Sequence, residues 1–415
     1  MRQVGSIGHV ASGNTPTVLR AAARAGAPAM RRLLCTFGLM LATAAMSQTP
    51  RPASPGVTAD AVLFGQSAKL SGSAGTMAGR PYRGGLMLAF TAANRAGGVH
   101  GRRIELLTLD DQNDGAKALA NTHALIEDKR VFALTGYTFT GSVQAALPLL
   151  RTHGVPLVGA YTGTPELYDD SQAMVFSLRA SFADELAAIV RHIDTIGYTR
   201  IALVHYTTRL GSELRDDVDQ RLKRIGRELA VSGRMPINAP DYTAAARNAV
   251  QPLVEHCPQL VIFGVSGRDA AAVVQAMAAS SCPPARYIGR NIVDLGQLQQ
   301  TLGHGARGVI VTQVVPSPSR GVHPLVSDYR AQLKLRDPQA RPDFTEFEGY
   351  IAGRVVLMAL QRAGRELDRA AFVKAMEQVY LEGPDHFRIQ FGSGRRAGSR
   401  YTNIVMVSDK DRITD

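Results

Sequence analysis

The 415-residue chain lacks any apolar run of the roughly 18 residues that a transmembrane helix requires. It also lacks a His-Glu-x-x-His motif, and its ten histidines are dispersed, so no metal site is predicted. No repeat of solenoid spacing is present. Hydrophobic residues make up 45% of the sequence and charged residues 20%, which excludes a wholly disordered chain. The composition is that of an ordinary globular protein.

The segment 30–47 predicts export. Met30-Arg31-Arg32 is followed by an apolar stretch at 33–45 that ends in small residues, a pattern typical of a secretory signal peptide. The alternative is an uncleaved N-terminal anchor. We expect residues 1–29 to be unstructured, with Met30 as an alternative start, and residues 48–59 to form a linker. The predicted product is a periplasmic protein that does not span the membrane after signal removal.

Charge gives little support for a nucleic-acid partner. Residues 1–47 contain five arginines and no acidic residue, so removing them lowers the formal charge from +12 to +7. The remaining basic residues are spread along the chain, and the doublets Arg102-Arg103 and Arg395-Arg396 have no interleaved aromatics. We therefore expect a solvated basic surface rather than a nucleic-acid groove.

Cysteine is scarce, and only Cys257 and Cys282 follow the predicted leader. Two cysteines alone do not form a zinc site. Each precedes a predicted strand, and if these parallel strands are neighbours, both cysteines lie at the amino ends. In an oxidising compartment they would then pair as a disulfide. The alternative is two free thiols.

From residue 61 onward, short apolar strands alternate with amphipathic helices, which predicts an α/β fold with parallel sheets. The predicted strands form two series, at 61–65, 103–109, 131–135 and 155–159, and then at 201–205, 260–263, 286–288 and 308–312. Ser181 and Asp184 predict a capping box, and Gly197 predicts the end of the helix that follows it. A second long helix is expected over 344–363, with C-terminal strands at 387–391 and 402–407. Two lobes are expected, because the mature chain is too long for one typical core.

The candidate binding loops follow predicted strands, where open parallel sheets bind ligands. The loop 136–142 contains Thr140, Gly141 and Ser142, and the loop 160–167 contains Tyr161, Thr162 and Gly163. Both combine hydroxyl groups and a glycine with a helix N-terminus, which favours a carboxylate or another anion. The alternative is that the hydroxyl groups only cap their own helices. The glycine-rich loop 70–79, which contains Ser71, does not match a nucleotide fingerprint and could line a cleft.

Enzyme motifs are weak. Gly264-Val265-Ser266-Gly267 is one residue short of a nucleophile elbow, and neither Ser266 nor Ser142 has a positioned His-Asp partner pattern. His205 at a strand end could act as a base, but a structural or cleft-lining role is favoured. The pair Asp110-Asp111 could act as acid and base, but loop capping is favoured. No cofactor is predicted, and an exported α/β hydrolase is kept only as an alternative.

In order and spacing, several motifs resemble periplasmic substrate-binding proteins of the leucine/isoleucine/valine-binding type. They are Leu70-Ser71-Gly72, Asn94 with Gly97-Gly98-Val99-His100-Gly101, Asp110-Asp111, the loops 136–142 and 162–167, Phe176-Ser177-Leu178-Arg179, and Glu348-Gly349-Tyr350. The resemblance covers nearly all of residues 60–415.

This resemblance implies the type I periplasmic binding fold, in which two Rossmann-like lobes with parallel sheets are joined by a three-strand hinge. Lobe 1 would comprise residues 60–178 and about 318–388, and lobe 2 residues 179–317 and about 389–415. The crossovers would fall near 177–181, 314–317 and 387–391. A small ligand would close the two lobes around itself.

The resemblance also assigns roles to the binding loops. The α-carboxylate and ammonium of an amino acid would lie against Ser142 and Thr162, with Tyr161 lining the pocket. However, Gly163 stands where branched-chain binders have a hydroxyl residue, and the segment near Asn238 lacks the acid that pairs with an ammonium. An unpaired buried ammonium would cost several kcal/mol.

Three residues of the second lobe, Tyr206, Arg209 and Arg290, would instead suit a carboxylate, an aromatic acid or an amide. The expected function is therefore an exported solute-binding receptor, not an enzyme. It would capture a small carboxylate-bearing ligand and deliver it to the membrane permease of an ABC importer. A ligand-sensing domain of the same fold is the other alternative.

Overall fold

The structure, a computed structural model, describes residues 54–72, 77–169, 171–408 and 413–414. The predicted signal peptide and the segment 1–29 lie outside the described residues. The described part of the predicted linker, residues 54–59, packs onto the first lobe. There Val57 forms an antiparallel bridge with Val62, and the Leu63 amide donates to the Gly56 carbonyl over 2.8 Å.

The first lobe is built on a sheet of five strands, all parallel, in the order β2-β1-β3-β4-β5. The strands are β1 (Ala61–Ala68), β2 (Arg103–Asp110), β3 (Ala133–Thr135), β4 (Leu157–Val158) and β5 (Val175–Phe176). Because the order reverses between β1 and β3, the loops that follow these strands diverge at the carboxyl edge, which is where such sheets bind ligands.

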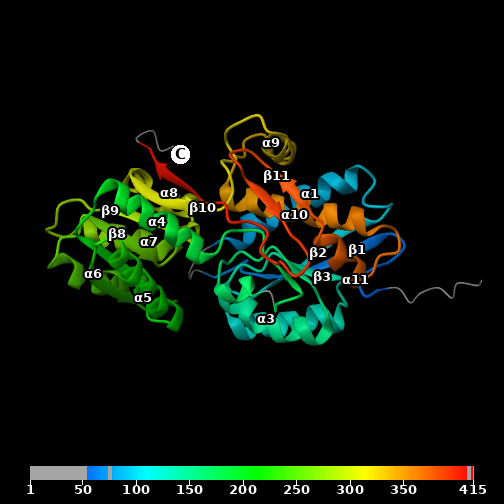
Figure 1. The fold of residues 1–415 in the computed structure, drawn as a ribbon, viewed down its shortest axis with the longest axis horizontal. Coiled ribbons are helices and arrows are strands. Elements are labelled where there is room, and N and C mark those ends of the chain that lie inside the picture. Colours follow the sequence, from blue (N-terminus) through cyan, green and yellow to red (C-terminus); the bar gives the residue numbers. More distant parts are fainter. Residues whose placement is uncertain (1–53, 73–76, 170, 409–412, 415) are drawn as a thin grey trace, which may run out of the picture. The chain divides into compact units, whose positions relative to one another are not determined.

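Helices from both halves of the chain cover this sheet (Figure 1). The helices are α1 (Gly79–Arg95), α2 (Gly115–His123) with a π turn (Ala124–Asp128), α3 (Thr140–His153), a 3-10 turn (Pro165–Tyr168), α9 (Pro324–Arg336), α10 (Phe344–Ala363) and α11 (Arg369–Met376). A hairpin of β11 (Tyr380–Glu382) and β12 (Arg388–Gln390) follows. Helices α1 and α10 meet closely at Gly85, where an added Cβ would lie 1.8 Å from the Glu346 carbonyl oxygen. Only glycine therefore fits this crossing.

The second lobe contains a seven-stranded sheet in the order β14-β13-β10-β9-β8-β6-β7, parallel except for β13 and β14. Its strands are β6 (Ile201–Tyr206), β7 (Leu229–Met235), β8 (Leu260–Gly264), β9 (Arg286–Gly289), β10 (Val309–Gln313), β13 (Asn403–Val407) and β14 (Ile413–Thr414). Its helices are α4 (Phe182–Ile196), α5 (Arg209–Arg224), α6 (Tyr242–Val254), α7 (Gly267–Ala278) and α8 (Leu295–Leu302), with 3-10 turns at Asn291–Val293 and Gly303–Ala306.

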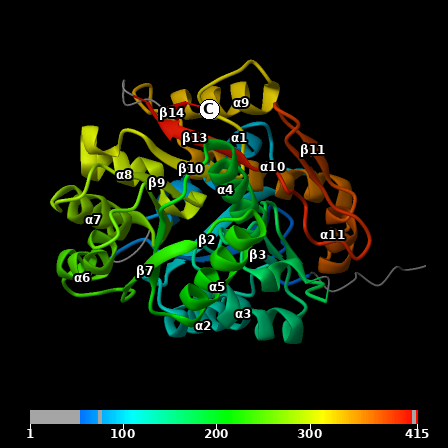
Figure 2. The ribbon, with the colours of Figure 1, turned by 60° about the vertical axis from the view of Figure 1, so that its left-hand side comes forward.

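Helices cover both faces of the second sheet (Figure 2), and successive side chains of β6 pack alternately against the helices of one face and of the other. Ile201 and Leu203 pack in the core that contains residues of α4 and α5. Ala202 and Val204 pack in the core that contains residues of α6, α7 and α8. A strand that is apolar on both faces is thus buried on both, as the unbroken apolar run predicts.

The predicted helix boundaries are confirmed where capping signals marked them. Ser181 and Asp184 form the capping box of α4, and Gly197 ends that helix at φ 82°. The predicted helix over 344–363 is α10. Strands β5 and β7 were not predicted from the sequence. The first has two residues, and the second is an edge strand that is mostly exposed or half-buried, so it lacks an apolar run.

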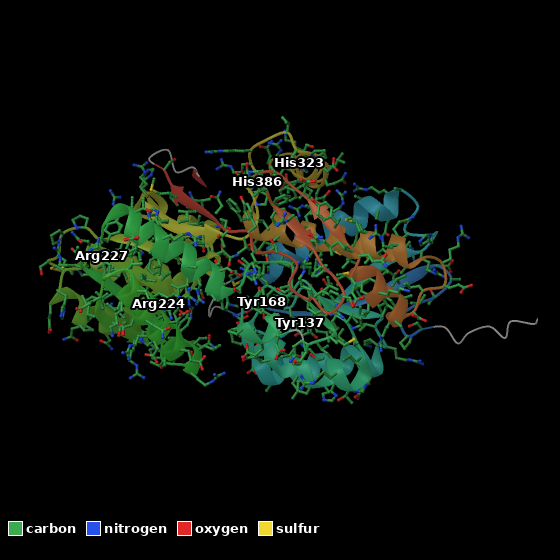
Figure 3. All side chains as sticks on the ribbon, viewed as in Figure 1. Tyr137, Tyr168, Arg224, Arg227, His323 and His386 are labelled. Atoms are coloured by element: carbon green, nitrogen blue, oxygen red, sulfur yellow. A yellow bond between two sulfur atoms is a disulfide. The ribbon has the colours of Figure 1, made fainter. Side chains whose placement is uncertain are left out.

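Three segments of the described chain connect the lobes, at 177–181, 314–323 and 391–402. Tyr168, labelled in Figure 3, supports the first, since its hydroxyl donates to the Arg179 carbonyl over 3.0 Å. The third connection follows β12 and overlaps the expected crossover near 387–391 at residue 391. Ile389 and Phe391 remain in the core of the first lobe, and the Phe391 ring packs edge-on against Phe176 at 5.2 Å. This packing places the lobe boundary after residue 391.

Cys257 and Cys282 form a disulfide, with a Cα–Cα distance of 5.2 Å. The two residues precede the neighbouring parallel strands β8 and β9. Both lie at the amino ends of these strands, opposite the edge from which the candidate loops emerge.

Candidate functional site

A cavity of about 470 Å³ is lined by loops of both lobes. All the lining segments follow the carboxyl ends of strands or continue into the helices after them. They comprise Asn113 after β2, residues 138–141 and Gln144 after β3, Tyr161, Thr162 and Pro165 after β4, the start of α4, Tyr206, Thr208, Leu210, Gly211, Glu213, Leu214 and Asp217 from the end of β6 onward, 237–238 after β7, Gly264 and Ser266 at and after the end of β8, and Arg290 and Ile292 after β9. The cavity therefore lies where parallel sheets bind small molecules.

The first-lobe wall contains the beginning of α3. Thr140 is the first residue of that helix, and Thr140, Gly141 and Thr162 line the cavity. The Thr140 and Thr162 hydroxyl groups hydrogen-bond to each other over 2.7 Å. The unpaired amides and positive dipole end of a helix N-terminus favour an anion. The two predicted loops thus converge on one wall.

Tyr161 completes this wall. Its hydroxyl group lies 3.3 Å from the Thr345 hydroxyl, and its ring packs edge-on against Tyr82 at 5.7 Å. Burial raises its pKa, so the side chain stays neutral and presents a ring rather than a charge. The phenol thereby joins the cavity wall to α10.

Three predicted residues of the first lobe lie outside the lining. Ser142 is fully buried and donates to Asp111 over 2.9 Å, so its hydroxyl group supports the loop from behind. Ser71 donates to Asp110. The Gly163 carbonyl accepts a hydrogen bond from the Phe182 amide over 2.8 Å, and an added Cβ would lie 2.6 Å from that nitrogen. The two aspartates thus hold loops, as loop capping predicts.

The second-lobe wall contains Tyr206 and Ser266. The Tyr206 hydroxyl group donates to Asp269 over 2.8 Å and accepts from the Ser266 amide over 3.2 Å, while the Ser266 hydroxyl lies 3.3 Å from it. Ser266 thus has a tyrosine as its hydrogen-bonding neighbour. His205 does not line the cavity. Its buried Nδ1 donates to the Tyr206 carbonyl over 2.9 Å, and burial lowers its pKa. These contacts describe a structural histidine.

Arg290 is the only cationic side chain among the lining residues of the described chain. Its guanidinium carbon lies 4.2 Å from the centre of the Phe182 ring, and its buried Nε has no hydrogen-bond partner. Burial lowers its pKa from the ordinary arginine value. A desolvated guanidinium of this kind gains strongly from a carboxylate, which it can bind through two parallel hydrogen bonds.

The two lining carboxylates already have cationic partners on the same helix. Glu213 pairs with Arg209, and Asp217 accepts from Arg221 over 2.7 Å. Arg209 itself is exposed and lies outside the lining. The predicted arginine pair on the second lobe thus separates into one residue in the cavity and one on the surface.

Sequence reasoning missed most of the apolar lining. Phe139, Phe182, Leu214 and Ile237 contribute to it, together with Ile292. Two positions offered a signal, since Phe139 lies in the candidate loop 136–142 and Phe182 directly follows the capping residue of α4. The others lie in segments whose exposure depends on how the two lobes face each other.

No helix in the part of the chain that the structure describes is both long and apolar enough to cross a bilayer. The same residues contain no cluster of three or more histidine, cysteine, aspartate or glutamate side chains that could hold a metal ion.

Comparisons with known proteins agree with this architecture. A family model described as periplasmic binding protein matches residues 61–412. The leucine-, isoleucine-, valine-, threonine- and alanine-binding protein of Pseudomonas aeruginosa is 22% identical over 311 residues, which cover 73% of this chain and 78% of that protein.

Solved structures give the same result. A substrate-binding periplasmic protein from Ralstonia solanacearum superposes with a TM-score of 0.77 at 26% identity, covering 85% of this chain and 99% of that one. A possible leucine/isoleucine/valine-binding protein from Rhodopirellula baltica superposes with a TM-score of 0.77 at 25% identity, covering 86% and 97%. The chain therefore belongs to the periplasmic binding protein family, with the type I fold and of the leucine/isoleucine/valine-binding type.

Proposed function

We propose that the protein is an exported receptor that captures a small acid with an apolar body and delivers it to the membrane permease of an ABC importer. Family membership supports the coarser part, a solute-binding receptor for small ligands. The observation that carries the finer part is Arg290, the single cation among the described residues that line this largely apolar cavity. The basic, apolar leader at 30–47 supports export to the periplasm.

Electrostatics favour a ligand that carries a carboxylate. Burying a carboxylate without a partner is costly, so an acid enters such a cavity only where a cation or oriented amides receive it. Arg290 and the N-terminus of α3 supply both, on opposite walls. A ligand that contacts both walls would draw the lobes together.

The two acids of the lining disfavour a ligand with an α-ammonium group. Glu213 and Asp217 are each paired with an arginine of α5. Because these arginines already neutralise the two acids in part, an ammonium would gain less from them, whereas an acid without an ammonium does not need them. We therefore propose an acid such as a 2-oxo acid or an aryl carboxylate, in preference to the matching amino acid.

The test is a thermal-shift screen with matched ligand pairs: 4-methyl-2-oxopentanoate against leucine, phenylpyruvate against phenylalanine, and benzoate against benzamide. The acid of a pair should raise the melting temperature at millimolar concentration and its partner should not. At a hundredfold excess over Kd, stabilisation is about 2.7 kcal/mol. If none of these compounds raises the melting temperature, the proposed ligand class is wrong.

Arg290→Met keeps much of the side-chain volume and removes the charge. We expect it to weaken binding of the acid at least tenfold, because the carboxylate would lose a charge-assisted hydrogen bond. Arg209→Met is the matched control, since Arg209 is an exposed arginine of the same lobe outside the lining. Equal affinity of wild type and Arg290→Met would contradict the assignment of Arg290.

Delivery to an importer is tested in the source cells. Deleting the gene should abolish uptake of the radiolabelled acid, and restoring the intact gene should recover it. Restoration with the Arg290→Met variant should recover uptake only at higher acid concentration. Unchanged uptake after deletion would argue for the alternative sensing role.

A further inference from the structure

A buried charge cluster lies where the lobes meet. It consists of Arg179 on the first crossover, Glu185 on α4 of the second lobe and Glu348 on α10 of the first lobe. Their side chains are 1%, 0% and 4% exposed. One guanidinium thus faces two carboxylates out of contact with water, and the cluster carries one negative charge in excess when both acids are ionised.

The guanidinium is shared between the two acids at equal distance. Arg179 Nη2 lies 3.6 Å from Glu185 Oε1, and Nη1 lies 3.6 Å from Glu348 Oε1. Both distances exceed that of a normal hydrogen bond. Arg179 Nε and Nη1 and Glu185 Oε1 have no hydrogen-bond partner. Buried polar groups are normally paired, so this arrangement is under-satisfied and can be improved by a small movement.

Several other contacts tie the cluster to the cavity walls, while Glu185 Oε2 also accepts from the Thr312 hydroxyl on β10 over 2.5 Å. Arg179 donates to the side-chain oxygen of Asn291, the residue between the lining residues Arg290 and Ile292. Its guanidinium carbon lies 4.7 Å from the centre of the Tyr161 ring, which lines the other wall. Glu185 Oε2 accepts from the Asn291 amide over 2.8 Å, which fixes that acid to the second lobe. The cluster is therefore connected to both lobes and to both walls.

We propose that Glu348 is a proton-linked positioning residue that acts through Arg179 to shift the two lobes between arrangements around the ligand cavity. Because Glu185 and Glu348 belong to different lobes, a rotation that moves α4 relative to α10 changes their separation and the share of the guanidinium that each receives. The affinity of Glu348 for a proton therefore differs between the lobe arrangements. By thermodynamic linkage, protonation of Glu348 then shifts the equilibrium between these arrangements.

The surroundings of Glu348 agree with this role. Burial is the main cause that raises its pKa to about 7; Arg179 opposes the rise and Glu185 adds to it. The other titratable groups that interact with it are the phenols of Tyr82 on α1 and Tyr161, and burial raises the pKa of both, so they stay neutral. Burial thus raises the pKa of Glu348 toward neutral pH at the point where it faces Arg179.

The experiment measures lobe separation without any ligand. A full chain carrying Cys35→Ser receives spin labels at Leu119→Cys on α2 and Arg224→Cys on α5, two exposed positions on different lobes (Arg224 is labelled in Figure 3). Pulsed dipolar spectroscopy between pH 5.5 and 8.5 should show two distance populations whose ratio changes with a midpoint near pH 7. Each unit of pKa difference between the arrangements changes this ratio about tenfold.

Glu348→Gln should remove the pH dependence of the ratio. Glu346→Gln should retain it, because Glu346 is a buried acid of the same helix that pairs with Arg336 away from the cluster. A ratio constant with pH in the wild type, an unchanged response in Glu348→Gln, or a lost response in Glu346→Gln would each overturn the proposal.

Glu185→Gln provides a second route if Glu348→Gln does not fold. Removing the like charge makes Glu348 easier to ionise, so the midpoint should move to lower pH, and an unmoved midpoint would overturn the proposal. The inference rests on the proposed two-lobed receptor function. Since no ligand is used, its failure is distinguishable from a failed ligand screen.

Discussion

The raised pKa of Glu348 predicts how the substitution Glu348→Gln changes the pH dependence of the free energy of unfolding. The pKa of this buried acid is raised from the ordinary glutamate value of 4.5 to about 7 in the folded protein. The folded state therefore holds the proton more tightly than the unfolded state. The stability contributed by this affinity is fully present below pH 4.5 and is lost as pH rises through about 7. A shift of about 2.5 pKa units corresponds to roughly 3 kcal/mol, of which about 2 kcal/mol falls between pH 5.5 and 8.

Glutamine does not ionise, so the variant lacks this loss. The free energy of unfolding of Glu348→Gln, relative to wild type, should rise by about 2 kcal/mol between pH 5.5 and 8. Urea denaturation at the two pH values measures the difference. The comparison of the two proteins cancels other groups, including Asp343, whose pKa burial also raises to about 7. A relative stability that is constant with pH, or that falls as pH rises, would refute the reasoning.

Two further predictions concern the fold. When the protein is denatured without reductant, neither Cys257 nor Cys282 should react as a free thiol, and two reactive thiols at these positions would contradict the disulfide. Replacing both cysteines with serine should lower the free energy of unfolding by about 3 kcal/mol, because the disulfide closes a loop with a sequence separation of 25. Gly85→Ala should destabilise by about 3 kcal/mol or more because its Cβ would overlap the Glu346 carbonyl, whereas Gly392→Ala, with no atom within 4 Å, should stay within about 0.5 kcal/mol of wild type. Equal melting temperatures of the two alanine variants would argue against the close crossing of α1 and α10.

Much of the architecture was predictable because local patterns specify it. Unbroken apolar runs identified strands buried on both faces, and the capping signals of α4 identified both ends of that helix. Edge strand β7 was not predicted, because a half-exposed strand needs no apolar run. The lobe in which Ile389 and Phe391 pack could not be predicted, because their local pattern is the same whichever lobe contains them.

The loops that form the site were predictable from the sequence, but which of their side chains line the cavity was less so. The sequence placed hydroxyl-rich loops after adjacent strands, and Thr140, Thr162 and Tyr161 do share one wall. It could not distinguish Ser142, which turns inward to Asp111, from Thr162, which lines the cavity. Nor could it separate Arg209 from Arg290, because exposure follows from packing between distant segments.

The sequence by itself determined the α/β class, the two-lobed organisation and the strand-end loops, since periodicity and helix capping are properties of neighbouring residues. Only the tertiary structure decided which arginine enters the cavity, and that Arg179, Glu185 and Glu348 share one buried cluster. These residues come from segments up to about 170 positions apart, and such distant groups are brought together by the packing of two lobes rather than by any local pattern.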